Sequence, residues 1–229
     1  MTRQVVNDGT GDSISQAPQM KIYTDRYMIY AHPLPNDSLG AYGIGTYTMQ
    51  DGKVTEYVFH TSEGGARNDT FQLDVSRRDG GYTQTIHFPP DSQGRNFVLV
   101  EEYDNVGKSV SSPLDGAWKM TEVRYISANG PARTDTRTQF KVYQSGHFIW
   151  VNTVPDSATN KPQSAFGYGT FEMNGDNQAT ERNVQSTYAS TLVGQPVTLQ
   201  LEFMGKDAYR QTLAMANGDK MVETYQRLK

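Results

Sequence analysis

Residues 165–173 read AFGYGTFEM, and residues 41–49 read AYGIGTYTM. The similarity extends well beyond this stretch in both directions. Residues 19–23 (QMKIY) match residues 139–143 (QFKVY), and further matches join 55–56 to 180–181, 82–86 to 209–213 and 100–103 to 222–225. Repeat units of solenoid proteins run about 20 to 50 residues, so a repeat of this length predicts two tandem domains.

Tyr, Thr, Val, Phe and Ile recur in short runs bounded by turn formers such as Asp51-Gly52 and Asn129-Gly130. This pattern is typical of antiparallel sheets. In the first copy we expect strands at residues 1–6, 19–24, 27–32, 41–49, 53–60, 71–76, 81–87 and 96–103. In the second copy we expect them at 116–126, 137–143, 146–152, 165–173, 178–188, 195–203, 208–214 and 219–227.

Eight sequential antiparallel strands leave two exposed edges unless the sheet closes on itself. We therefore predict an all-β protein of two tandem eight-stranded antiparallel up-and-down barrels, at residues 1–107 and 113–229. A pair of β-sandwiches is the alternative, because alternation along a strand does not show whether a sheet closes. Met1-Thr2 align with Met120-Thr121, so the opening strand of the first barrel is expected to be truncated.

The composition narrows the classes of partner. The 229 residues include no cysteine and carry a formal net charge of −4 without a basic run, which argues against a nucleic-acid partner. No apolar run approaches the roughly 18 residues of a membrane span. We expect a periplasmic or secreted protein, with a cytoplasmic location left open. A homodimer would form if a neighbouring chain supplied the missing part of the first barrel.

The second copy opens its first strand with Gly116-Ala117-Trp118 and closes its last strand with Arg227. This combination resembles the calycin or lipocalin-like signature, and the units resemble lipocalin-like domains of exported proteins from Bacteroidetes-type bacteria. The resemblance implies that Trp118 fills the barrel floor beneath Arg227, where a cation–π contact is worth about 0.5–2 kcal/mol. The first copy has no matching Trp, and Asn105 stands in place of Arg227.

An eight-stranded barrel has room for its own side chains or for one small ligand. Aromatic residues are plentiful in the expected strands, and Tyr hydroxyls can orient a polar ligand. They could instead pack the core or cover the exterior. The residues that we place near a ligand pocket are Tyr30, His32, Tyr42, Phe148, Trp150, Phe166, Tyr168 and Tyr209.

Three residues of the first copy are candidates for acid–base catalysis: Glu56, His60 and Tyr82. His60 lies four residues after Glu56, so regular alternation would place both on one face of a strand. The carboxylates that recur in both copies, Glu56 with Glu181 and Glu101 or Glu102 with Glu223, have a simpler interpretation as outward-facing charges that discourage edge pairing. His147 follows Gly146 and is expected to be exposed. No histidine spacing indicates a metal site, and no cofactor is expected.

Two functions from different classes follow. The first is binding of a small hydrophobic or amphipathic molecule in a Tyr-rich lumen. The alternative is a cofactor-independent lyase, isomerase or hydratase that uses Tyr, His and Glu as acid and base. A protein-interaction or cell-envelope scaffold remains open if side chains fill both lumens.

The glycines of the opening stretch alternate on one face of their strand. Gly43 and Gly45 in the first copy, like Gly167 and Gly169 in the second, leave that face bare. Such a strand can coil sharply or allow close approach to its backbone. We expect it to bend around each lumen, with the Ile44 and Tyr168 difference marking where the two pockets diverge.

Overall fold

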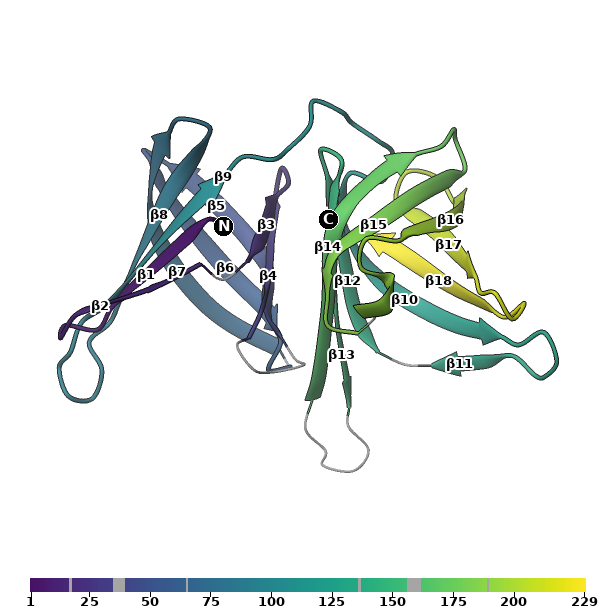
Figure 1. Cartoon of the computed structure of the whole chain (residues 1–229), viewed down its shortest axis with the longest axis horizontal. Coiled ribbons are helices and arrows are strands. Elements are labelled where there is room, and N and C mark those ends of the chain that lie inside the picture. Colours follow the sequence, from purple (N-terminus) through teal and green to yellow (C-terminus); the bar gives the residue numbers. More distant parts are fainter. Residues whose placement is uncertain (17, 35–39, 65, 136, 156–161, 189) are drawn as a thin grey trace.

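A computed structural model describes residues 1–16, 18–34, 40–64, 66–135, 137–155, 162–188 and 190–229 (Figure 1). Two antiparallel sheets follow each other along the chain and lie side by side. The first sheet has the strands β1 (Arg3–Asn7), β2 (Asp12–Ser15), β3 (Met20–Tyr23), β4 (Tyr27–Pro33), β5 (Gly40–Gln50), β6 (Lys53–Thr61), β7 (Ala66–Arg78), β8 (Gly81–Phe88) and β9 (Phe97–Asp104). The second has β10 (Gly116–Ile126), β11 (Arg133–Asp135), β12 (Thr138–Gln144), β13 (His147–Pro155), β14 (Pro162–Met173), β15 (Gln178–Ser186), β16 (Pro196–Phe203), β17 (Ala208–Ala214) and β18 (Lys220–Arg227).

The all-β prediction with two tandem barrel units is confirmed, and each expected strand has its counterpart. Two short strands, β2 and β11, were not expected. Each pairs with the opening strand of its own unit, β2 with β1 and β11 with β10. The single short 3₁₀ turn among the described residues, η1 (Ser190–Leu192), follows β15. No helix in these residues is long and apolar enough to cross a membrane.

The second sheet is a closed barrel, because β10 pairs with two strands at once. Its first residues, from Gly116 to Lys119, pair with β12, and its stretch from Trp118 to Ile126 pairs with β18. The first sheet is curled but remains open within the described residues. Its order runs β2-β1-β9-β8-β7-β6-β5-β4-β3, and no ladder joins β3 to β1.

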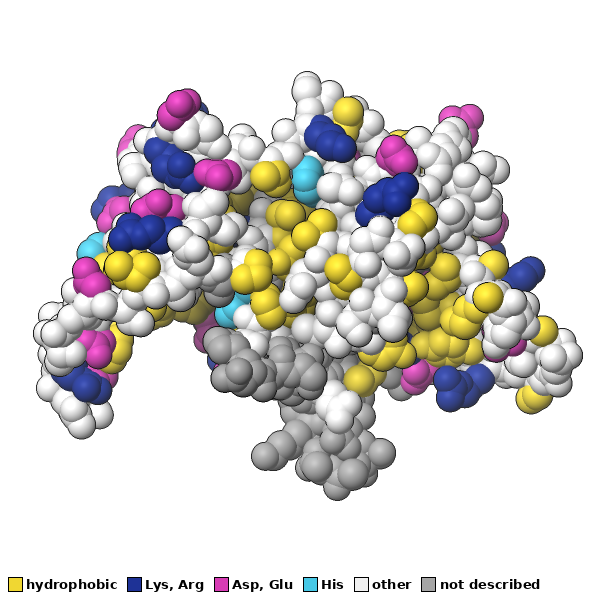
Figure 2. All heavy atoms as spheres, viewed as in Figure 1, with side chains coloured by type: hydrophobic (Ala, Val, Ile, Leu, Met, Phe, Trp, Pro, Cys, Tyr) yellow, Lys and Arg dark blue, Asp and Glu magenta, His cyan; other side chains and the backbone are white. Residues whose placement is uncertain are grey.

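The two units pack through equivalent strands, with β3, β4 and β5 against β12, β13 and β14. Outward-facing apolar side chains of both units form one core there. It includes Ile29 and Ile44 from the first unit and Phe140, Ile149 and Phe166 from the second. Figure 2 shows hydrophobic side chains gathered in the middle of the molecule, between the two units, and again over the second barrel. The barrel exteriors are therefore apolar where they meet, which fixes the two units against each other.

Candidate functional site

The interior of the second barrel holds a buried chain of charged and polar side chains. Lys141 Nζ lies 2.7 Å from Glu181 Oε1 and donates to Gln211 Oε1 at 3.3 Å. Gln211 Nε2 in turn donates to Glu223 Oε2 at 2.6 Å. Tyr143 donates to Glu181 at 2.5 Å. The connected side chains come from β12, β15, β17 and β18, so this series of polar contacts crosses the lumen of the second barrel.

The first sheet contains the same network at the repeat-equivalent positions. Lys21 Nζ lies 2.7 Å from Glu56 Oε1 and donates to Gln84 Oε1 at 3.3 Å. Tyr23 donates to Glu56 at 2.6 Å, and Gln84 donates to Glu101. Both copies of the repeat have this network, so it is a property of the repeated unit. Because unpaired buried charges are costly, each buried lysine and carboxylate needs the partners that the network supplies.

A second carboxylate in each unit is held by neutral donors. Glu223 accepts from Tyr225 at 2.9 Å and from Gln139 at 3.2 Å. Glu101 accepts from Tyr103 at 3.1 Å and from Gln19 at 3.3 Å. Each network therefore contains two carboxyl groups and one lysine.

The interpretation of these carboxylates as outward-facing charges was wrong. Glu56, Glu181 and Glu223 are 2%, 5% and 4% exposed, and Glu101 is buried likewise. Alternation within a strand does not say which face is inside, and acidic residues are almost never fully buried unless they are paired. The signal that could have shown it was the repeat of Lys-x-Tyr and Tyr-x-Gln in both copies, because these segments supply the partners of the carboxylates.

The tyrosines of the network are held as neutral donors. Burial raises the pKa values of Tyr143 and Tyr225 well above the ordinary value of a tyrosine. The Glu181 carboxylate raises the pKa of Tyr143 further, and the Glu223 carboxylate does the same for Tyr225. Burial and Glu101 do the same to the pKa of Tyr103. A neutral phenol donates its proton to a carboxylate, so these raised pKa values keep the network intact.

At one end of the second barrel, Trp118 and Arg227 form the plug that the sequence implied. The guanidinium lies 3.9 Å from the centre of the indole ring. Arg227 also donates to the carbonyl oxygens of Asp115, Pro113 and Lys206. Beneath the guanidinium, Trp118 is 1% exposed and stands edge-on to Tyr209 at 4.8 Å.

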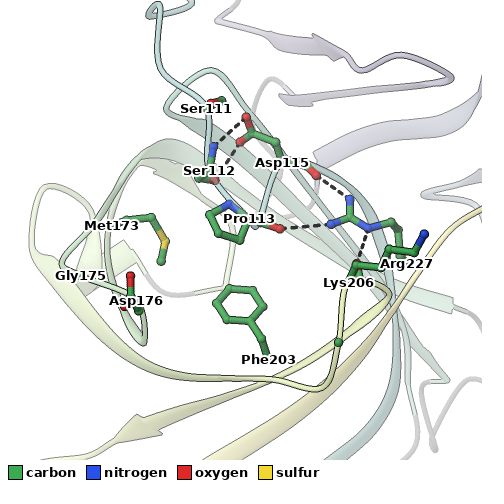
Figure 3. Close-up of a pocket in the computed structure, with 11 residues that line it drawn as sticks. Ser111, Ser112, Pro113, Asp115, Met173, Gly175, Asp176, Phe203, Lys206 and Arg227 are labelled. Carbon is green, nitrogen blue, oxygen red and sulfur yellow. Dashed lines mark hydrogen bonds between the residues drawn. The ribbon is translucent and has the colours of Figure 1, made fainter.

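A surface cavity of about 680 Å³ lies outside this plug (Figure 3). Pro113, Met173, Phe203 and Arg227 are among its lining residues, and none of the network residues is. The plug therefore separates this cavity from the interior of the second barrel.

The corresponding end of the first sheet is different. A cavity of about 400 Å³ is lined there by Gln19, Lys21, Tyr23, Tyr82 and Tyr103, which are part of the internal network or stack on one of its members. Gln144, Ser145 and His147 of the second unit also line it. Asn105, which stands where Arg227 does in the second copy, lines the same cavity. In the first unit the network is thus open to a cavity of ligand size.

The bare glycine face lies inside each unit, opposite to the face that the pocket assignment of Tyr42 and Tyr168 implied, and one aromatic ring covers it. A Cβ on Gly43 would come within 2.6 Å of the Tyr30 ring, and one on Gly167 within 2.5 Å of the Trp150 ring. Glycine lets these rings lie directly on the backbone. Phe148 packs in the same interior core as Trp150.

Three of the expected ligand residues lie elsewhere. Tyr42, Phe166 and Tyr168 are part of the core between the two units, and so is Ile44. They occupy the strand face opposite the glycines, and that face meets the other unit. The difference between Ile44 and Tyr168 therefore marks the interface and not the pockets. Tyr209, by contrast, is fully buried in the interior, at the plug.

The structure does not bring Glu56 and His60 together as an acid–base pair. A β-bulge between Val58 and His60 shifts the alternation, so that Glu56 lies opposite Tyr47 while His60 lies opposite Ile44. A bulge adds one residue and turns the following side chains to the other face.

The histidines take other places than expected. His60 contacts Tyr42 and Thr153 at the interface. His32 Nδ1 lies 3.2 Å from the Pro33 carbonyl oxygen. His147 is 8% exposed, which corrects the expectation of an exposed residue. No group of three or more His, Asp or Glu side chains in the described parts of the chain is arranged to hold a metal ion.

Residues 113–229 match the family described as a domain of unknown function, DUF4488. The chain belongs to this family. The DUF4488 match spans the closed barrel from β10 to β18, and so includes the plug and the second network. No curated protein sequence matches the chain.

Two solved structures are similar to the chain at low identity. A redesigned β-barrel is 15% identical, with coverage of 51% of this chain and 93% of that one and a TM-score of 0.34. A DUF3598-family protein of unknown function from Nostoc punctiforme is 9% identical, with coverage of 99% and 94% and a TM-score of 0.29. Likenesses this distant say nothing about a ligand or reaction for the DUF4488 barrel.

Proposed function

We propose that the protein binds a small amphipathic molecule in the interior of its barrel units. The observation that carries this proposal is the cavity of about 400 Å³ that reaches the buried network of the first unit. Ligand sites are concave, mostly apolar and lined by a few converging polar groups. Lys21 and Gln19 supply such polar groups, and the faces of Tyr82 and Tyr103 supply the apolar surface.

The interior of the second barrel supports the same function through a different set of side chains. Tyr125, Trp150, Val197, Leu213 and Met221 are half-buried and pack on its core. They come from five strands, and Tyr125, Met221 and Leu213 are register partners on adjacent strands. A molecule held there would place its apolar part against these side chains and its polar part toward the network.

A ligand screen tests the proposal. Amphipathic molecules are titrated into the protein while the melting temperature and the tryptophan fluorescence are followed, because a ligand that binds only the folded state raises its stability. Trp150 lies in the interior wall and Trp118 is sealed under the plug, so a ligand in the second barrel should change the fluorescence of Trp118→Phe but not that of Trp150→Phe. Calorimetry detects a ligand in the first unit. The absence of any stabilisation across a broad panel would contradict the proposal.

The acid–base reaction has less support from the geometry. The partners of Glu56 are Lys21 and Tyr23, and the bulge turns His60 toward the second unit. Unchanged turnover in His60→Ala and Glu56→Gln on an identified substrate would remove that alternative.

Export to the periplasm or the cell exterior stays a prediction, and so does a dimer through an exposed sheet edge. Cell fractionation tests the first. Sedimentation velocity over a range of protein concentrations tests the second, and a single monomer species would contradict it.

A further inference from the structure

The two units carry the same pair of stacked tyrosines at their corresponding ends. In the second barrel, the rings of Tyr209 and Tyr225 stack at 5.0 Å with 9° between their planes. In the first sheet, the rings of Tyr82 and Tyr103 stack at 4.9 Å with 11° between their planes. What lies next to this pair differs between the units.

In the second barrel the neighbouring space is filled by two side chains. The Trp118 indole stands edge-on to Tyr209 at 4.8 Å, and the Arg227 guanidinium covers the indole at 3.9 Å. An aromatic ring and a cation thus form a stack on the tyrosine pair, which is a favourable arrangement for both.

In the first unit the neighbouring space is the cavity of about 400 Å³, with Tyr82 and Tyr103 in its wall. The backbone shows that Asn105 takes the position of Arg227. Asn105 N donates to the Gly80 carbonyl oxygen at 2.8 Å, and Arg227 N donates to the equivalent Asp207 carbonyl oxygen at 2.9 Å. The Asn105 side chain is shorter than that of Arg227 and carries no charge.

The charges around the cavity complete the comparison. Lys21 is paired with Glu56, while Glu101 is bound by neutral donors. Asp104 also lines the cavity, and it pairs with Arg78. The Met1 ammonium lines the cavity as well; burial lowers its pKa, while the Glu101 and Asp104 carboxylates act in the opposite direction.

From this comparison we infer that the cavity of the first unit binds a planar aromatic molecule that bears a cationic nitrogen. The ring takes the place that the Trp118 side chain takes in the second barrel, against Tyr82. The cationic nitrogen takes the place of the Arg227 guanidinium, beside Asn105. This inference rests on the proposed binding function and adds the chemical class of the ligand.

Three probes that share one ring test the inference by calorimetry: tryptamine, indole and indole-3-acetate. We expect tryptamine to bind about tenfold more tightly than indole, and indole-3-acetate to bind most weakly. Equal affinities, or the reverse order, would overturn the assignment of charge.

Two substitutions at one position test the location. Asn105→Arg supplies the missing guanidinium and fills the cavity, so tryptamine affinity should fall by at least about tenfold while the melting temperature holds or rises. Asn105→Asp leaves the cavity open and adds a carboxylate beside the cationic nitrogen, so tryptamine affinity should rise by about two- to fivefold. Unchanged tryptamine affinity in a folded Asn105→Arg variant would overturn the location.

The screen for amphipathic ligands separates the two levels of the argument. If no indole probe binds but another amphipathic molecule does, this inference is wrong and the proposed function stands. If nothing binds to either unit, both are wrong.

Discussion

Lys141→Met tests whether the buried ion pair holds the second barrel together. Lys141 Nζ and Glu181 Oε1 are 2.7 Å apart, and the two side chains are only 3% and 7% exposed. Removal of the lysine leaves the Glu181 carboxylate buried without a cation, with Tyr143 as its remaining donor. Loss of one partner from such a pair costs about 3–5 kcal/mol. We expect the free energy of unfolding to fall by that amount.

The measurement is equilibrium unfolding in urea, followed by tryptophan fluorescence. Both tryptophans belong to the second barrel, so the signal reports the unit that carries the change. Arg210→Met is the matched control. Its guanidinium lies 2.9 Å from Glu202, but the two side chains are 41% and 63% exposed, so the loss should be about 0–1 kcal/mol.

A double variant separates the charge from the packing. Lys141→Met with Glu181→Leu removes both charges, so it should be more stable than Lys141→Met alone. The reasoning would be refuted if Lys141→Met were as mild as Arg210→Met, or if the double variant were the less stable of the two.

Three further predictions concern the glycines, the plug and the buried phenols. Gly169→Ala would place a Cβ 1.9 Å from a backbone carbonyl oxygen of β15, whereas a Cβ on Gly11 meets nothing within 4 Å. Thermal melting should therefore show a loss of about 1–3 kcal/mol in the free energy of unfolding for Gly169→Ala and none for Gly11→Ala. Arg227→Met removes the cation–π contact with Trp118 and the hydrogen bonds to three carbonyl oxygens, so the free energy of unfolding in urea should fall by about 1–3 kcal/mol. The fluorescence emission of Trp118 should also change, and an unchanged spectrum would contradict the plug. Burial raises the pKa of Tyr30 and of Tyr168 from 10.0 to about 12. Because the unfolded chain ionises near pH 10, the stability from these phenols is full below pH 10 and is lost as the pH rises through 12, and phenolate absorbance should show the two phenols ionising at higher pH in the folded protein than in the unfolded chain.

The duplication shows how far a single sequence can predict an architecture. Matching segments such as residues 19–23 and 139–143 occur at a nearly constant offset, and the strands between turn formers follow from local preferences. Both depend only on neighbours in the chain. The partnership of Trp118 and Arg227 was implied by the resemblance to the lipocalin-like signature, and it joins the first and last strands of one unit, which meet when a barrel closes.

The candidate site was predictable only in part. The recurring carboxylates were recognised, but their direction was wrong because alternation defines two faces without saying which one is inside. His60 was placed on the face of Glu56 because a bulge leaves no reliable mark in a single sequence. Tyr42 and Phe166 were assigned to a lumen because nothing local distinguishes an aromatic side chain that faces a ligand from one that faces a second domain.

The sequence by itself determined the two units, their strands and the chemistry available in each, because these follow from local preference and from the repeat. The tertiary structure alone decided which glycine-bearing face lines the interior, which apolar face joins the two units, and that Lys21, Glu56, Gln84 and Glu101 meet in one network. The physical reason is that burial and pairing are properties of strands brought together from distant parts of the chain. It is also why the stretch AYGIGTYTM, alike in pattern to AFGYGTFEM, lies in a unit whose network opens to a cavity, whereas its twin lies in one that Trp118 and Arg227 close.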